Sequence, residues 1–162
     1  GCVRSTSSAW AWSADSTPAS AQPLANPANS DAGSAPSAFA SAGERTYFLA
    51  YQDGRSGLLR TDGSAAGTVQ MEQAPLYCSD SGFDVATALG GDFVYANCHG
   101  YELLRLRPDE VVPEVLAAFP RGENLSSTTI GADLYLARDA DPGHELWRSD
   151  GTPAGTDGNA RS

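Results

Sequence analysis

The chain contains no lysine, a single methionine, three cysteines and two histidines among its 162 residues. All ten basic residues are therefore arginines, and the 20 acidic residues outnumber them to give a net charge of −10. Because nucleic acids and anionic lipids are bound through clusters of basic side chains, this balance argues against both as partners. The sequence also lacks an apolar run of about 18 residues, so it predicts no transmembrane segment.

Large apolar side chains are scarce in residues 1–42, where alanine, serine and proline occupy 26 of the 42 positions. So little apolar surface cannot offset the conformational entropy lost on ordering, which costs about 1–2 kcal/mol per residue. We therefore expect residues 1–42 to form a disordered Ala/Ser/Pro-rich tether. The alternative is a poorly packed first repeat unit, which Trp10 and Trp12 would support.

The pair Gly1-Cys2 precedes this segment and resembles the end of a bacterial lipoprotein signal. That resemblance implies that Cys2 is a lipidation site, and acylation there would anchor the chain to a membrane surface. The alternative is an incidental cysteine in a truncated chain.

The other two cysteines, Cys78 and Cys98, flank one predicted hairpin and are candidates for a disulfide. Closing a loop of this size would stabilise the fold by roughly 3 kcal/mol in the chain-entropy model. Disulfides persist in oxidising compartments, so the pair predicts an extracytoplasmic protein that is secreted, periplasmic or lipid-anchored at the outer surface. Two buried free thiols are the alternative.

Residues 43–162 contain an internal repeat. Segment 58–68 is identical to segment 146–156 at seven of eleven positions, and residues 103–105 supply a shorter third copy near the midpoint. Similar apolar strands precede all three copies. The motif positions are Leu58, Arg60, Asp62, Gly63, Gly67 and Thr68 in the first unit and Glu145, Leu146, Trp147, Arg148, Asp150, Gly151, Thr152, Gly155 and Thr156 in the last.

A period near 44 residues with several short strands per unit is typical of β-propeller blades. We expect units near 43–80, 81–122 and 123–162, and in the second unit strands at 83–89, 93–97, 101–107 and 111–119. Glycine accepts positive φ, so Asp62-Gly63 and Asp150-Gly151 are expected to close hairpins. Closed propellers have at least four blades. The predicted fold is therefore all-β, with roughly three antiparallel four-stranded blades of an incomplete β-propeller.

The leucine and arginine positions of the repeat predict how the blades meet. Leu58, Leu103 and Leu146 are expected to point between blades, and Leu59, Leu104 and Trp147 should lie on the opposite strand face. The recurring Arg60, Arg105 and Arg148 allow two interpretations. They could form a ring facing an anionic ligand, or each could pair with an acidic residue of the neighbouring blade.

Segment 145–156, Glu-Leu-Trp-Arg-Ser-Asp-Gly-Thr-Pro-Ala-Gly-Thr, closely resembles the bacterial ELWxxDGT tandem repeat. The first unit departs from that pattern at Gly57 and Leu59. The resemblance implies a propeller-like secreted or surface protein and brings no general enzymatic activity. We therefore expect a non-enzymatic exported module, a scaffold or a binding domain for carbohydrate or protein, whose partners include further blades of the same chain or other copies. The alternative is a fragment of a propeller hydrolase or lyase with catalytic residues in the central channel.

Catalytic and cofactor signals are sparse in the sequence. His99 and His144 occupy similar places in successive units, as a repeat produces without selection for catalysis, and we assign no catalytic residue or organic cofactor. Asp139, Asp141 and Glu145 offer alternating oxygen ligands in a tight loop and are candidate calcium ligands. Asp and Gly are also ordinary hairpin residues, which is the competing interpretation.

Overall fold

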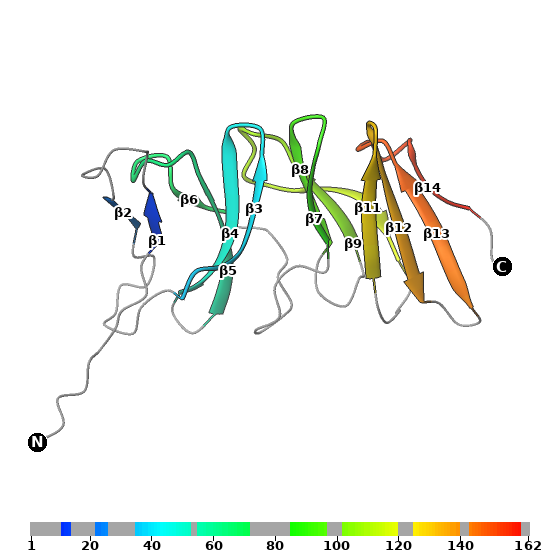
Figure 1. Ribbon diagram of the computed structural model, residues 1–162, viewed down its shortest axis with the longest axis horizontal. Coiled ribbons are helices and arrows are strands. Elements are labelled where there is room, and N and C mark those ends of the chain that lie inside the picture. Colours follow the sequence, from blue (N-terminus) through cyan, green and yellow to red (C-terminus); the bar gives the residue numbers. More distant parts are fainter. Residues whose placement is uncertain are drawn as a thin grey trace, which may run out of the picture.

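The computed structural model describes residues 11–13, 22–25, 35–52, 55–71, 85–96, 102–119, 125–139 and 143–159. Every regular element in these segments is a β-strand, and the strands form three four-stranded antiparallel sheets and one two-stranded ribbon. The three large sheets stand side by side in chain order and form an open row along the long axis of the molecule (Figure 1).

Each large sheet pairs its strands in sequence order, so that every strand is hydrogen-bonded to the next one in the chain. The first sheet contains β3 (Ser37–Ala42), β4 (Arg45–Gln52), β5 (Arg55–Thr61) and β6 (Val69–Gln70). The second sheet contains β7 (Val85–Leu89), β8 (Asp92–Ala96), β9 (Glu102–Leu106) and β10 (Glu114–Ala118). The third sheet contains β11 (Leu125–Ile130), β12 (Asp133–Asp139), β13 (His144–Ser149) and β14 (Thr156–Asn159).

The predicted all-β fold with three antiparallel four-stranded sheets is confirmed. The predicted end of the tether is wrong, because β3 lies within it and pairs with β4 through Ser41↔Thr46 and Ala42↔Arg45. Strands β1 (Ala11–Ser13) and β2 (Gln22–Ala25), which form the ribbon, also fall inside the predicted tether. Trp10, Cys2 and most of the remaining tether lie outside the described residues.

The composition of β3 misled the prediction because the apolar side chains on its core-facing side are small. Ala42 is buried, and Ala38 and Ala40 pack with it against the core between the first and second sheets. Alanine has little area to bury, but here it lets a strand lie close to the neighbouring sheet. A strand on the inner side of such a contact therefore needs no large side chain.

The first core lies between the first and second sheets and is built on stacked aromatic rings. Phe93 lies between Tyr47 and Tyr95, with ring centroids 4.1 Å and 5.3 Å away. All three side chains are at most 1 % exposed. Leu58 from the first sheet and Leu104 from the second complete this core. Burying each such side chain contributes about 1.5–3 kcal/mol.

The second core lies between the second and third sheets. It contains Leu103 and Val94 from the second sheet and Leu134 and Leu136 from the third, with Trp147 packed against them. Leu103 and Leu104 therefore point to opposite neighbours, and Leu58 and Leu59 likewise belong to different clusters. The expected alternation of the leucine pair is confirmed for the first two sheets, because successive strand residues face opposite sides of a sheet. The expectation that Leu146 points between blades is wrong for the described residues, because Leu146 is 50 % exposed and Trp147 is the residue that faces the second sheet.

Candidate functional site

The loops that join the third and fourth strands of the first and third sheets share their side-chain hydrogen bonds. Asp62 Oδ1 accepts from the Ser64 amide and hydroxyl at 2.9 and 2.7 Å, and Asp150 Oδ1 accepts from the equivalent groups of Thr152 at the same distances. The Thr68 hydroxyl donates to the carbonyl of Ser64 at 2.7 Å, and the Thr156 hydroxyl donates to the carbonyl of Thr152 at the same distance. The repeat motif therefore specifies one loop structure twice.

The hairpins are closed at the Asp-Gly steps as expected, and in each hairpin this step begins a longer loop. The loops span residues 62–68 and 150–155. Gly63 and Gly151 do have the expected positive φ, at 90° and 86°. A Cβ atom at Gly67 or Gly155 would overlap the carboxylate of Asp62 or Asp150. The second glycine of the motif is thus required because the aspartate folds back across the loop.

Sequence reasoning missed two hydroxyl residues at the base of these loops. Thr61 and Ser149 accept from the amides of Gly63 and Gly151 at 3.0 and 3.1 Å. They are 5 % and 0 % exposed. A hydroxyl residue stands before Asp-Gly in both full copies, and this shared position was the available signal.

Hydrogen bonds in the loops also lower the pKa values of two aspartates. The hydroxyl and amide of Ser64 lower the pKa of Asp62, and Thr152 lowers the pKa of Asp150 in the same way. Because the pKa of each aspartate is lower in the folded state than in the unfolded state, its ionised carboxylate stabilises the fold. This stabilisation is fully present above the ordinary aspartate pKa, near 4, and is lost as the pH falls through the lowered pKa of the folded state.

We expect Thr152→Ala to raise the pKa of Asp150 toward its ordinary value, because it removes the hydroxyl that donates to the carboxylate. Carboxyl ¹³C chemical shifts followed from pH 6 down to acid unfolding measure this change. Asp62, in the unaltered first loop, is the internal control. An Asp150 pKa that is unchanged by the substitution would contradict this account of the loop.

Replacing Gly151 with valine is expected to destabilise the fold by about 1–3 kcal/mol, because a β-branched residue is strained at positive φ. A Cβ atom there would also lie 3.1 Å from Leu89 Cδ2 in the second sheet. Urea unfolding measures the loss. Gly131 has a φ of 64° with no heavy atom within 4 Å of its added Cβ, so Gly131→Val controls for backbone strain alone. Equal losses for the two variants would argue against close sheet contact at Gly151.

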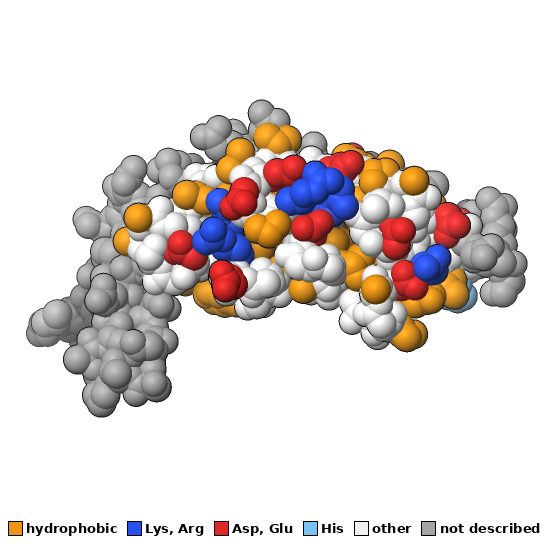
Figure 2. Space-filling view, turned by 90° about the horizontal axis from the view of Figure 1, so that it is seen from above, with side chains coloured by type: hydrophobic (Ala, Val, Ile, Leu, Met, Phe, Trp, Pro, Cys, Tyr) orange, Lys and Arg blue, Asp and Glu red, His pale blue; other side chains and the backbone are white. Residues whose placement is uncertain are grey.

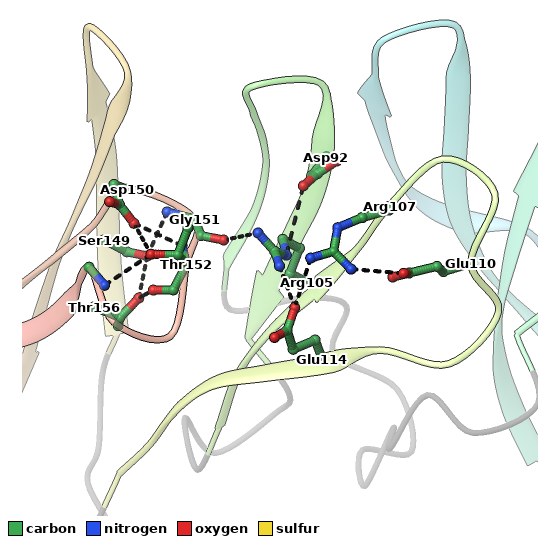
Figure 3. Close-up of polar contacts among 11 residues, drawn as sticks. Asp92, Arg105, Arg107, Glu110, Glu114, Ser149, Asp150, Gly151, Thr152 and Thr156 are labelled. Atoms are coloured by element: carbon green, nitrogen blue, oxygen red, sulfur yellow. Dashed lines mark hydrogen bonds and ion pairs between the residues drawn. The ribbon is translucent and has the colours of Figure 1, made fainter.

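The motif arginines connect neighbouring sheets through backbone carbonyls. Arg60 of the first sheet donates from Nη1 to the carbonyls of Pro108 and Glu110, in the loop between β9 and β10. Arg105 of the second sheet donates from Nη1 to the carbonyl of Gly151, in the loop between β13 and β14 (Figure 3). Each arginine thus reaches from its own third strand into the loop before the fourth strand of the next sheet.

Two carboxylates of the second sheet, the sheet that contains Arg105, contact its guanidinium group. Its Nη2 donates to Glu114, and its Nε lies 3.7 Å from Asp92. Arg107 shares the Glu114 carboxylate at 3.3 Å and pairs with Glu110 at 2.8 Å. Figure 2 shows arginine and acidic side chains beside one another along this end of the sheets. The Arg105 side chain is only 9 % exposed, so its charge is compensated where little water reaches it.

Arg148, the third motif arginine, bonds only within its own sheet in the described part of the chain. Its Nη2 lies 3.0 and 2.9 Å from the two carboxylate oxygens of Asp133, and its side chain is 51 % exposed. The three arginines therefore occupy successive sheets, and the two that cross an interface bind carbonyls. The prediction of carboxylate partners in the neighbouring sheet is corrected: the carboxylates of Arg105 and Arg148 belong to their own sheets.

The structure does not bring the described calcium candidates together. Asp139 pairs with His144 Nδ1 at 2.7 Å on one face of the third sheet. Glu145, on the opposite face, accepts from Arg138 at 3.0 Å and from Trp147 Nε1 at 3.1 Å. Asp141 lies outside the described residues, and within those residues no group of three His, Cys, Asp or Glu side chains could hold a metal ion.

Replacing His144 with alanine is expected to change the free energy of unfolding by no more than about 0.5 kcal/mol, because exposed ion pairs contribute little. The His144 side chain is 76 % exposed. Arg138→Met, on the opposite face of the same strand pair, is the matched control and should cost more, because Arg138 is 3 % exposed. Urea unfolding of both variants measures the difference. A loss at His144 as large as at Arg138 would show a role for the histidine that its exposure does not explain.

Several sequence predictions are not tested by these residues. Cys2, Cys78, Cys98 and His99 lie outside the described segments, so lipidation and the disulfide stay predictions. Comparisons of the chain with protein-family models, with curated proteins and with solved structures find no match, and the ELWxxDGT resemblance likewise stays a prediction. In the part of the chain that is described, no helix has the length and apolar character needed to cross a bilayer.

Proposed function

We propose that the chain is a non-enzymatic exported repeat module, a scaffold or a binding domain for carbohydrate or protein in the periplasm or at the cell surface. The observation that carries this proposal is the use of the motif side chains. The motif aspartates and threonines bond within their own loops, and Arg60 and Arg105 join neighbouring sheets. Motif residues that shape loops and join neighbouring sheets have the roles expected in a structural array of repeated sheets.

We further propose that the three sheets are blades of a β-propeller type. Each sheet follows the antiparallel strand order that a blade requires. Strand β7 contacts both β3 and β11, so the first strands of the three sheets follow one another along one side of the row. The fourth strands β10 and β14 contact each other as well. The ELWxxDGT resemblance, with its tandem blades, supports the same arrangement.

Export is supported by the cysteine pattern of the sequence. The pair Gly1-Cys2 resembles a lipidation motif, and Cys78 and Cys98 form the candidate disulfide. A disulfide of this kind persists in an oxidising compartment. These features favour a secreted, periplasmic or lipid-anchored location.

Affinity electrophoresis through gels that contain soluble polysaccharides, combined with a reducing-end assay on the same mixtures, tests the proposal. The expected result is retarded migration in at least one gel with no release of reducing ends, or, for a protein-binding module, no change in either assay. An unrelated protein of similar acidic charge is the control, because charge alone alters migration. Release of reducing ends at a rate proportional to the concentration of the protein, and lost when the protein is heated beforehand, would overturn the non-enzymatic assignment. It would favour the hydrolase or lyase alternative.

A further inference from the structure

The outer face of the third sheet, defined here by Ile130, Leu146 and Arg148 and directed away from the second sheet, exposes apolar side chains. Ile130 is 63 % exposed and Leu146 is 50 % exposed, although both lie in strands. Ala137 lies opposite Leu146 across the strand pair, and Tyr135 lies opposite Arg148. Six large apolar side chains are exposed in the described residues, and Ile130 and Leu146 are the two that share this face with Arg148.

The same three positions are buried in the second sheet. Leu89 precedes the turn to β8 as Ile130 precedes the turn to β12, and it is 6 % exposed. Leu103 and Arg105 correspond to Leu146 and Arg148 in the repeat and are 0 % and 7 % exposed. All three are covered because the third sheet packs on that face. The outer face of the third sheet thus repeats a surface that, one unit earlier, holds a neighbouring sheet.

The contacts of the motif arginine differ between the second and third sheets, although both arginines pair with an aspartate of their own sheet. Arg105 has both an own-sheet aspartate, Asp92, and an acceptor in the next sheet, the Gly151 carbonyl. Arg148 has the equivalent own-sheet aspartate, Asp133, which it binds through both oxygens. Its carboxylate contact in the described residues therefore corresponds to the Asp92 contact of Arg105, and the own-sheet Glu114 and the carbonyl of the next sheet belong to Arg105.

We propose that the outer face of the third sheet is a docking site for one further four-stranded sheet of the same repeat. The partner sheet presents a loop of the Asp-Gly-x-x-x-Gly-Thr type before its fourth strand. The carbonyl of the first loop glycine accepts from Arg148, as the Gly151 carbonyl accepts from Arg105. Ile130 packs against that glycine, as Leu89 lies against Gly151. This inference rests on the proposed repeat-module function.

A second copy of the chain fits this face less well than an added sheet. In a head-to-tail pair, the copy would have to offer the side of its first sheet that points away from the second. Much of that side is already buried, because Phe48, Ala50 and Leu59 there are 0 %, 2 % and 3 % exposed. Among the described residues, Phe39, which stacks on Phe48, is the large apolar side chain left exposed there, at 59 %. The continuity of the leucine and arginine positions therefore favours a further repeat sheet as the occupant.

The test uses the full chain extended at its C-terminus by a second copy of residues 119–159, which supplies the proposed sheet. Leu146→Asp is then placed either in the original third sheet or at the equivalent position of the added copy. The two extended proteins have the same composition, and each is the other's control. Docking buries the original leucine and leaves the added one on the new outer face.

We expect the substitution in the original sheet to lower the folded-to-unfolded ratio about tenfold or more in urea, in line with the burial of one leucine side chain. The same substitution in the added copy, or in the unextended chain, should leave this ratio nearly unchanged. Arg148→Ala should follow the same pattern with a smaller loss.

Equal effects at the two positions, or an added copy that stays unfolded, would overturn the proposed docking. Concentration-dependent dimers of the unextended chain that Leu146→Asp abolishes would overturn it in favour of a second copy. The proposed function fails on a different measurement, the release of reducing ends, so the two failures are distinguishable.

Discussion

Replacing Arg105 with methionine is expected to lower the free energy of unfolding by about 2–4 kcal/mol. The substitution keeps the aliphatic stem and removes the hydrogen bonds to Glu114 and to the carbonyl of Gly151. Hydrogen bonds to charged groups contribute about 1.5–3 kcal/mol, and loss of one partner of a buried charge network costs more. Equilibrium unfolding in urea measures the change.

Arg107→Met is the matched control for that variant. Arg107 shares the Glu114 carboxylate with Arg105 and is 46 % exposed. Solvent-exposed ion pairs contribute about 1 kcal/mol or less, so this substitution should cost at most that amount. A loss at Arg107 equal to that at Arg105 would contradict a specific role for the contact between the second and third sheets.

Replacing Phe93 with alanine should cost about 3–5 kcal/mol, the range for removing a buried aromatic side chain. The Phe93 ring is fully buried, and it stacks on Tyr47 across the interface and on Tyr95 within its own sheet. The substitution therefore leaves a cavity between two sheets. Urea unfolding gives the loss, and an unchanged slope with denaturant would show that the variant still unfolds from the same compact state.

Phe39→Ala is the control for the Phe93 substitution. The Phe39 ring stacks on Phe48 at 5.3 Å but is 59 % exposed. The expected loss is below about 1.5 kcal/mol, because the ring contact contributes little beyond the small area it buries. If both substitutions cost the same, the aromatic stack between the first two sheets would not be the main core of that interface.

The repeat was sufficient to predict the three sheets and the alternation of the leucines in the first two of them. Seven identical positions over two distant segments fix a common strand register, and strand alternation then sends Leu58 and Leu59 to opposite sides. Strand β3 was missed because composition measures how much area a segment can bury. It does not show that Ala38, Ala40 and Ala42 have a neighbouring sheet close enough to need only small side chains.

The acceptors of the arginines could not be predicted from the sequence. A backbone carbonyl has no sequence signature, so the bond from Arg105 to Gly151 depends on how closely two sheets approach. The need for the second motif glycine, Gly67 or Gly155, could not be predicted from the sequence either. The clash that it avoids arises only because the aspartate folds back across the loop. By contrast, the separation of Asp139 from Glu145 follows from strand alternation once β12 and β13 have defined bounds.

The contact between Arg105 and Gly151 can be measured directly by NMR of the arginine guanidinium group. A hydrogen bond from Nη1 to the Gly151 carbonyl predicts slowed rotation of the guanidinium, resolved Nη resonances and a scalar coupling across the bond to the Gly151 carbonyl carbon. Arg148, which is half exposed, serves as the internal comparison. Averaged Nη resonances for Arg105 with no coupling to Gly151 would contradict the assignment of the motif arginines as links between neighbouring sheets.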